Sequence, residues 1–392
     1  MPGLGDAPGP DVARSRGRAD RGRVAQYVLG VGRTTLLGVA MTNTPSSTLN
    51  TLHGRRALVT GGLGFCGVNL VRFLAEQLSC EVTVVDDLSN SAMPAKPLSG
   101  VTTVVGDVRD AAVMAPLLHD HEYVFHLACR TILTCGADPR SDLEVNAEST
   151  LQMLELLRRE RPAALQRFLY TSSTSIYGNC RHVPTDELDP PHILNHYAAT
   201  KLLGEHYTLL YHTAYDVPTT CVRYSNVFGP GQTPRNPYCG VVGKFIEAAL
   251  DGQPLTVHGD GEQTRDYTYI DDVVEATALA AASPKALGDV FNIGTGVETS
   301  VNALAEEIAR LAGADSDIEH VDRRDIDNIR RRALSPEKIR LRLGWQPQFR
   351  LREGLRRTIE HERAGRYARQ HAAVSEANAQ AARTAERPAG RR

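Results

Sequence analysis

The fold class of this chain is decided by the stretch Arg56-Ala-Leu-Val-Thr60-Gly61-Gly62-Leu63-Gly64-Phe65-Cys66-Gly67. Its first five residues form a short apolar run that is typical of a buried strand. Glycines follow at once, and apolar residues then recur at helical spacing through Val68–Leu78. Glycine between a strand and a helix lets the backbone turn tightly and approach a pyrophosphate, which the helix N-terminus attracts. Glycine triplets also occur in plain structural turns, so the interpretation depends on the rest of the chain.

The same alternation of strand and helix continues beyond this turn. Further apolar runs that read as strands lie at Glu81–Asp86, Thr102–Gly106, Tyr123–Leu127 and Phe168–Ser172. Strand–helix–strand order predicts a doubly wound parallel sheet of the Rossmann type, with helices on both faces. Asp86 ends the second run about 20 residues after the glycines, where an acid accepts hydrogen bonds from the adenosine ribose. An acid there repels a 2′-phosphate and favours NAD over NADP, although Asp86 could also simply cap a loop.

The composition excludes several classes of protein. The 392 residues are 42% hydrophobic and 23% charged, with a formal net charge of −2, which argues against a nucleic-acid binder. The seven cysteines form no CxxC pair, so we expect neither a disulfide framework nor a metal site, but reduced thiols in a cytoplasm. No apolar run is long enough for a membrane span.

Composition also divides the chain. Residues 1–50 are rich in Gly, Pro and Arg, and we predict a disordered extension, with a transit-like segment or a true start at Met41 as alternatives. A Rossmann domain is expected over 53–222, completed by later segments around 262–295. Residues 223–365 are expected to form mainly a substrate-binding lobe of discontinuous α/β structure, and 366–392 a disordered tail.

A candidate catalytic group lies at the next strand end and the helix after it. Tyr197 and Lys201 form a YxxxK pair, whose side chains share one helix face. A tyrosine normally titrates near ~10, and a neighbouring ammonium favours the phenolate and lowers that value. Upstream, Leu169–Gly178 places Ser173 among several hydroxyl residues where an α/β sheet gathers its site.

These motifs together resemble the extended short-chain dehydrogenase/reductase family, over roughly Arg56 to Arg363, and within it the NAD-dependent NDP-sugar epimerases of the UDP-glucose 4-epimerase type. The resemblance is carried by the glycine turn, by Asp86–Ser91, Gly106–Asp110 and His126–Ala128, and by the YxxxK pair. It implies that NAD is the cofactor. The residues that it places against NAD are Gly61, Gly64, Phe65, Cys66, Gly67, Asp86, Asn90, Ser91, Asp107, Val108, Leu127, Ala128, Tyr197, Lys201 and Tyr224.

The resemblance extends to a UDP- or dTDP-sugar substrate. Arg223–Gly231 resembles a family segment whose asparagine, here Asn226, contacts the substrate diphosphate, and Thr264–Asp272 resembles one whose arginine, here Arg265, binds it. Arginine suits this role because its planar fork is always charged. For a second such arginine we choose Arg324, leaving Arg323 and Arg330–Arg332 open. Gln232–Gly243 is expected to line the sugar pocket.

The reaction is inferred from two positions. Dehydratases of the family carry an Asp-Glu pair where this chain has Thr174 and Ser175, which favours an epimerase. Ser173 would bind the substrate hydroxyl, and Tyr197 would remove its proton during transient oxidation at C4. A net oxidoreductase, a uronate decarboxylase and a dehydratase remain alternatives, whereas a non-catalytic NAD sensor would usually lack the YxxxK pair. By analogy, helices at Leu143–Arg159 and Tyr197–Tyr215 pair in a homodimer.

Overall fold

The structure, a computed structural model, describes residues 47–90, 100–132, 138–232, 240–323 and 329–367. Its centre is a seven-stranded sheet in which all neighbouring strands are parallel. The strand order is β11-β6-β5-β4-β1-β2-β3, which reverses direction between β1 and β4, as in doubly wound folds. The predicted fold class is therefore confirmed. The strands are β1 (Arg56–Thr60), β2 (Glu81–Asp86), β3 (Val101–Val105), β4 (Tyr123–His126), β5 (Arg167–Ser173), β6 (Thr219–Tyr224) and β11 (Val290–Ile293).

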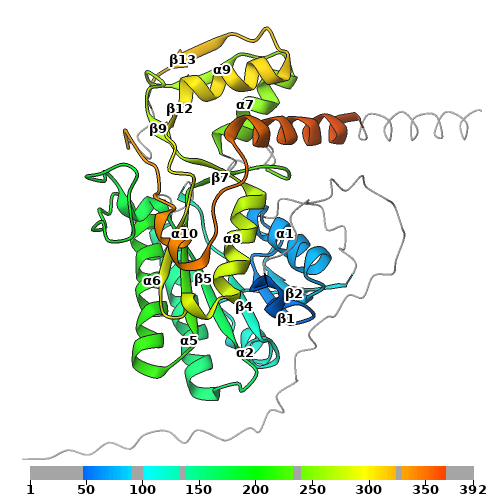
Figure 1. Ribbon diagram of the computed structural model, residues 1–392, viewed down its shortest axis with the longest axis vertical. Coiled ribbons are helices and arrows are strands. Elements are labelled where there is room, and N and C mark those ends of the chain that lie inside the picture. The colour runs from blue at the N-terminus through cyan, green and yellow to red at the C-terminus, as the bar shows by residue number, and fades with distance from the viewer. Residues whose placement is uncertain (1–46, 91–99, 133–137, 233–239, 324–328, 368–392) are drawn as a thin grey trace, which may run out of the picture.

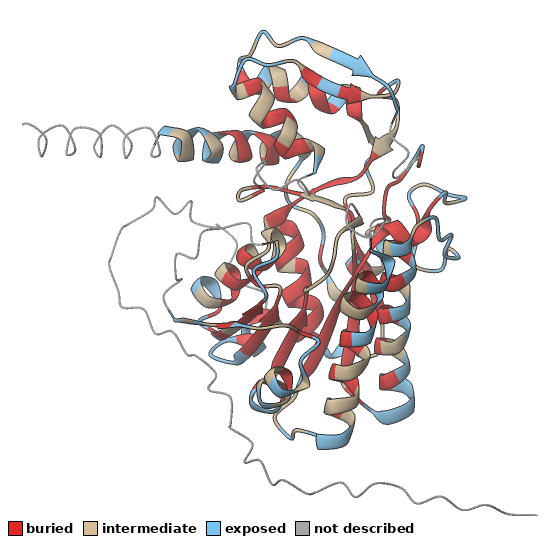
Figure 2. Ribbon diagram, turned by 180° about the vertical axis from the view of Figure 1, so that it is seen from behind, coloured by how far each residue is buried: buried red, intermediate tan, exposed pale blue. Residues whose placement is uncertain are grey.

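Helices cover both faces of this sheet (Figure 1; Figure 2). Side chains alternate along each strand, so Val59 joins the hydrophobic cluster on one face and Leu58 the cluster on the other. The first cluster is closed by α1 (Phe65–Arg72), η2 (Phe73–Gln77) and α8 (Ile270–Ala282). The second is closed by α2 (Ala111–Asp120), α5 (Ser149–Glu160) and α6 (His196–Tyr215).

Before α5 the chain passes through α4 (Pro139–Leu143) and η3 (Glu144–Glu148), a π-helical turn. The helix expected over Leu143–Arg159 is thus three consecutive segments, and α6 begins one residue before its predicted start.

The smaller lobe lies above the carboxyl ends of the strands (Figure 1). It contains α7 (Val241–Leu250), α9 (Val301–Ala312), the parallel pair β8 (Leu255–His258) and β13 (Ile318–Val321), and a helix over 351–367. Two further pairs belong to the same half of the chain: β7 (Asn226–Phe228) with β10 (Tyr267–Tyr269), and β9 (Thr264–Arg265) with β12 (Thr299–Ser300).

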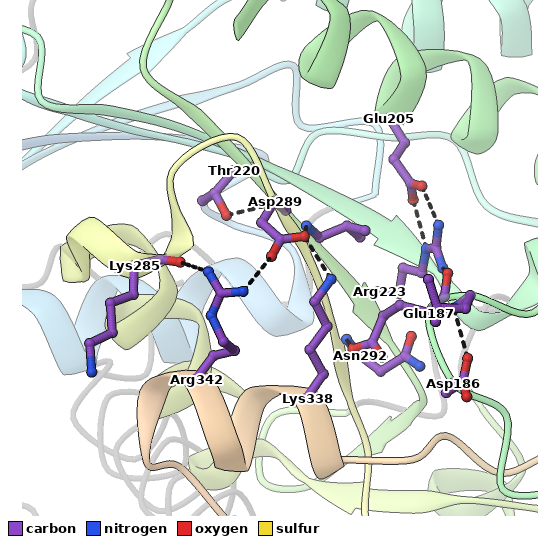
Figure 3. A network of polar contacts seen from close by, with 12 residues as sticks. Asp186, Glu187, Glu205, Thr220, Arg223, Lys285, Asp289, Asn292, Lys338 and Arg342 are labelled. Carbon is purple, nitrogen blue, oxygen red and sulfur yellow. Dashed lines mark hydrogen bonds and ion pairs between the residues drawn. The ribbon is translucent and has the colours of Figure 1, made fainter. Parts of the chain in front are cut away.

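Within the span expected to form mainly the substrate lobe, α8 and β11 return to the larger lobe. Helix α10 (Glu337–Leu343) also returns, and Lys338 Nζ lies 2.6 Å from Asp289 Oδ1 at the edge of β11 (Figure 3). Short helical turns η4 (Thr174–Tyr177) and η5 (Pro284–Ala286) complete the described elements.

Both predicted ends of the folded body need correction. Leu49 and Leu52 in the turn η1 (Leu49–Leu52) are buried in the main core against α8, so the fold begins before residue 50. The composition of this segment did not predict the turn, because the residues between the two leucines are polar. At the other end, Arg366 belongs to the helix over 351–367 and pairs with Asp251. The remaining parts of both predicted tails, 1–46 and 368–392, lie outside the described residues.

Within these described ranges, no helix combines the length and apolar character needed to cross a membrane. The cysteines that the structure describes, Cys66, Cys80, Cys129, Cys180 and Cys221, are free thiols.

Candidate active site

A cavity of about 440 Å³ opens at the carboxyl ends of β1, β2, β4, β5 and β6. This is where ligands bind in doubly wound sheets, because the strand order reverses there. Its walls include every residue that the sequence assigned to the cofactor except Ser91, which lies outside the described residues. Ser173 and Asn226 line it as well.

The glycine turn between β1 and α1 is packed against its neighbours. A methyl group on Gly67 would lie 2.2 Å from the carbonyl oxygen of Gly61, so only glycine fits where α1 crosses the turn. Gly61 has φ +67° and lies against the backbone of Ala128, which holds the turn against the end of β4. No side chain caps the start of α1 at Gly64. The first helical amides and the helix dipole therefore suit a pyrophosphate, as NAD binding requires.

Asp86 fixes the adenosine end of the cavity. Its carboxylate accepts hydrogen bonds from the backbone N–H of Leu63 and of Leu88, each at 2.9 Å. A carboxylate is an acceptor with about four positions, which suits Asp86 to hydroxyl donors such as those of a ribose. The wall continues at Asp107, where the hydrogen bond from Arg109 holds the pKa of the carboxyl below its ordinary value. The residues present fit the adenosine half of NAD.

The three predicted catalytic residues meet at the other end of the cavity. Asn195 starts α6 by accepting a hydrogen bond from Ala198 N at 2.8 Å, which sets Tyr197 in the first turn. Lys201 is only 2% exposed, and its Nζ lies 4.4 Å from the centre of the Tyr170 ring. Burial lowers the pKa of Lys201 from its ordinary value. Ser173, at the end of β5, accepts a hydrogen bond from Ser175 N at 3.1 Å.

The residues predicted to hold the substrate diphosphate are only partly brought to this cavity. Asn226 lines it, whereas Arg265 does not: Arg265 is buried nearby and donates from Nη1 to the carbonyl oxygen of Ile329 at 2.9 Å. Arg332 is buried as well. Burial raises the pKa of the Tyr267 phenol to about 12, and the charges of Arg265 and Arg332 act in the opposite direction. Arg324 lies outside the described residues, as does most of the expected sugar-pocket segment.

Arg223, the first residue of the motif that contains Asn226, serves the scaffold instead. Its guanidinium pairs with the Glu205 carboxylate on α6 through two bonds, at 2.5 and 3.0 Å (Figure 3). A third bond reaches the Tyr177 hydroxyl, which in turn donates to Asn292 Oδ1 at 2.9 Å. This buried pair fastens α6, and with it Tyr197 and Lys201, to the strands β6 and β11.

Comparison with known proteins agrees with this geometry. The family model described as "NAD dependent epimerase/dehydratase family" matches residues 57–294. The chain belongs to this family. The UDP-glucose 4-epimerase of Mycolicibacterium smegmatis is 38% identical over 313 residues, which is 78% of this chain and 97% of that protein.

Two solved structures of the family are similar in fold. The UDP-glucose 4-epimerase of Thermotoga maritima, determined with UDP-glucose, is 34% identical with a TM-score of 0.74, covering 79% of this chain and 99% of that one. The dTDP-glucose 4,6-dehydratase DesIV of Streptomyces venezuelae, determined with NAD, is 29% identical with a TM-score of 0.72, covering 79% and 98%. Membership in the family confirms the predicted resemblance and the predicted NAD cofactor.

Part of the wall of this family site was not among the residues predicted from the sequence. The segment after β4 contributes Cys129, Arg130 and Thr131, and Arg109 adds a cation at the adenosine end. Cys129, Arg130 and Thr131 follow His126-Leu-Ala directly, and Arg109 follows the end of β3, so the rule that strand ends line the site was sufficient to find them.

Proposed function

We propose that this chain is an NAD-dependent epimerase that inverts C4 of a UDP- or dTDP-linked sugar. The observation that carries the proposal is the distribution of carboxylates. Among the described residues of the cavity wall, the acids are Asp86, Asp87 and Asp107, which lie at or just after the ends of β2 and β3, at the adenosine end. The positions after Ser173 hold buried Thr174 and Ser175. Elimination of water needs an acid and a base there, whereas reversible oxidation needs only Ser173, Tyr197 and Lys201.

The residues of the site act on one hydroxyl group. Tyr197 as phenolate takes the proton of the C4 hydroxyl, and Ser173 hydrogen-bonds the same oxygen. Lys201, whose ammonium is held under the Tyr170 ring, supplies the positive charge that favours the phenolate. NAD, when bound, supplies the hydride acceptor and donor. Arg265 with a second arginine, Arg324 or Arg332, holds the diphosphate while the 4-keto sugar turns its other face to the site.

The proposal includes a homodimer in the cytoplasm. Helix α6 leaves Leu203 and Leu210 exposed, at 38% and 52%, and α4 adds Leu143. A second copy that covers these leucines would remove apolar surface from water. Leu203 and Leu210 belong to α6, the helix that carries Tyr197 and Lys201, so dimer formation would also stiffen this helix.

The test incubates the purified protein with UDP-glucose, UDP-glucuronate and dTDP-glucose without added NAD(H), while chromatography follows the sugars and absorbance follows NADH. We expect one stereoisomer to form without net NADH, and Tyr197→Phe to lower kcat by roughly 10²–10⁴ because the proton acceptor is lost. Consumption of NAD(H) one-for-one with product would instead identify a net oxidoreductase, and release of carbon dioxide a decarboxylase.

A further inference from the structure

Arg130 is a cation in the cavity wall that the mechanism above does not use. It follows β4 by four residues and lines the cavity with Ser173, Tyr197 and Lys201. Its Nε is shielded from solvent and has no hydrogen-bond partner among the described residues. A buried guanidinium nitrogen without an acceptor is costly, which points to a bound group that supplies one.

The other cations of the described wall already have partners. Arg109 is paired with Asp107 at 2.6 Å and with Glu144 at 3.1 Å. Lys201 lies beneath the Tyr170 ring and serves Tyr197. Arg130 forms no ion pair with any residue of the described chain, although a guanidinium is the side chain best suited to a carboxylate or phosphate. Its charge is therefore available to a ligand.

The backbone of Arg130 is fixed beside the catalytic helix. Asn146 Oδ1 accepts from Arg130 N at 2.8 Å, and Asn146 Nδ2 donates to Arg130 O at 3.3 Å. The same amide nitrogen reaches Asp142 Oδ1 at 2.5 Å and Thr200 Oγ1 at 3.2 Å, the neighbour of Lys201. Asn146, Asp142 and Thr200 are buried. These hydrogen bonds hold the Arg130 backbone near Lys201, so the Arg130 side chain starts at the end of the cavity that contains the catalytic residues.

The diphosphates expected in the complex have other sites. The start of α1 suits the cofactor pyrophosphate, and the proposed function assigns the substrate diphosphate to Arg265 and a second arginine. An anionic group at the reacting end is then carried by the sugar. We propose that Arg130 binds a carboxylate on the sugar ring, so that the preferred substrate is an NDP-hexuronate rather than an NDP-hexose. This inference rests on the proposed epimerase function and names its substrate class.

The test compares wild type with Arg130→Gln, which removes the charge at similar size, and with Arg140→Gln, which alters an exposed arginine on α4. For each protein, kcat/KM is measured with UDP-glucuronate and UDP-glucose, together with the amount of NAD retained. Binding of both nucleotides is also titrated in the Tyr197→Phe background. We expect wild type to prefer UDP-glucuronate. Arg130→Gln should lose roughly tenfold to a hundredfold on that substrate in both rate and binding, with UDP-glucose and NAD unchanged.

Equal losses on both nucleotides would overturn the inference and indicate a diphosphate contact, and a loss of retained NAD would indicate a cofactor contact. Inversion of UDP-glucose in preference to UDP-glucuronate would also overturn it, while leaving the epimerase proposal intact. If no nucleotide sugar is inverted, the epimerase proposal fails by itself, and the binding titrations still decide whether Arg130 recognises the carboxylate. An unchanged Arg140→Gln shows that any loss is specific to the cavity.

Discussion

At the scale of the residue, the His126 imidazole next to the site is held in its neutral form by its surroundings. Its ring is buried at the end of β4, where Nδ1 lies 2.7 Å from Thr60 Oγ1 and Nε2 lies 3.0 Å from Thr150 Oγ1. Burial, reinforced by the charge of Lys201, lowers the pKa of His126 to about 3. The imidazole therefore stays neutral and adds no second positive charge beside Lys201.

This burial makes the folded protein sensitive to mild acid. The unfolded chain binds a proton at His126 below about pH 6.5, whereas the folded protein resists protonation until about pH 3. Stability is lost as pH falls through this window. The group alone should lower the free energy of unfolding by about 2 kcal/mol between pH 7 and pH 5. Urea denaturation at several pH values measures this slope.

His126→Gln is the matched variant, because glutamine keeps hydrogen-bonding atoms between the two threonines but does not titrate. We expect a shallower pH dependence than in wild type. Burial also lowers the pKa of His121, which is present in both proteins and cancels in the comparison. Parallel curves for the two proteins would show that His126 does not carry the effect.

The residues of the site differ in how far the sequence could predict their place. Residues at the ends of parallel strands, such as Asp86 and Ser173, were found because topology alone brings strand ends together. Arg265 and Arg332 depend on how separate segments of the smaller lobe fold over each other, and local spacing carries no signal for that. Arg130 lies just after the end of β4, so its position near the site could be predicted, but no motif distinguished it from its neighbours.

At the scale of the element, the turn from β1 into α1 requires glycine for its close packing. In Gly67→Ala the new methyl group would meet the Gly61 carbonyl oxygen at 2.2 Å and the Gly62 Cα at 2.7 Å. Both contacts are with backbone, so the start of α1 must move. We expect a loss of about 1–3 kcal/mol in the free energy of unfolding and protein purified without NAD. Thermal unfolding and cofactor content measure the two effects.

Gly64→Ala provides the graded comparison within the same turn. Its methyl group would lie 3.3 Å from the Gly61 carbonyl oxygen, which a small adjustment can accommodate. The cost in stability should therefore be smaller than for Gly67→Ala. If Gly67→Ala retained cofactor and stability better than Gly64→Ala, close packing of α1 on the turn would not be what selects glycine at residue 67.

The elements themselves were predictable to different degrees. Strands β1 to β5 agree with their predicted bounds within about one residue, whereas no bounds were predicted for β6 and β11. Burial on both faces produces the continuous apolar runs of β1, β4 and β5. The turn η1 was missed because only Leu49 and Leu52 are buried in an otherwise polar segment. The π-helical turn η3 was missed because an apolar period of helical type does not distinguish hydrogen-bonding patterns.

At the scale of the whole molecule, Asp266 joins the two lobes. Its side chain is buried between β9 and β10, and its carboxylate accepts from Thr295 N and Gly296 N, which follow β11 of the main sheet. It also accepts from Leu334 N at 3.1 Å. Its own carbonyl oxygen accepts from Asn226 N at 2.9 Å, so the same residue sets the backbone of a cavity-lining side chain.

Asp266→Asn should therefore loosen the smaller lobe without removing the cofactor site. An amide offers one acceptor oxygen and a donor group where the native carboxylate meets backbone N–H donors from three residues. We expect the free energy of unfolding to fall by about 1–3 kcal/mol. The KM for the nucleotide sugar should rise while NAD is retained, because the glycine turn and Asp86 belong to the other lobe. Denaturant unfolding, steady-state kinetics and cofactor content measure these effects.

The exposed Asp260→Asn, which alters a surface pair with Arg330 in the smaller lobe, is the control and should leave stability and KM close to wild type. An Asp266→Asn protein that was destabilised but kept its KM would mean that the lobes hold their relation through other contacts. A rise in KM specific to Asp266→Asn would instead show that substrate affinity depends on how the smaller lobe is fastened to the sheet. That dependence explains why one Rossmann domain can serve several sugar chemistries: the cofactor half is fixed by strand ends, while the sugar half is set by a lobe attached through a few buried contacts.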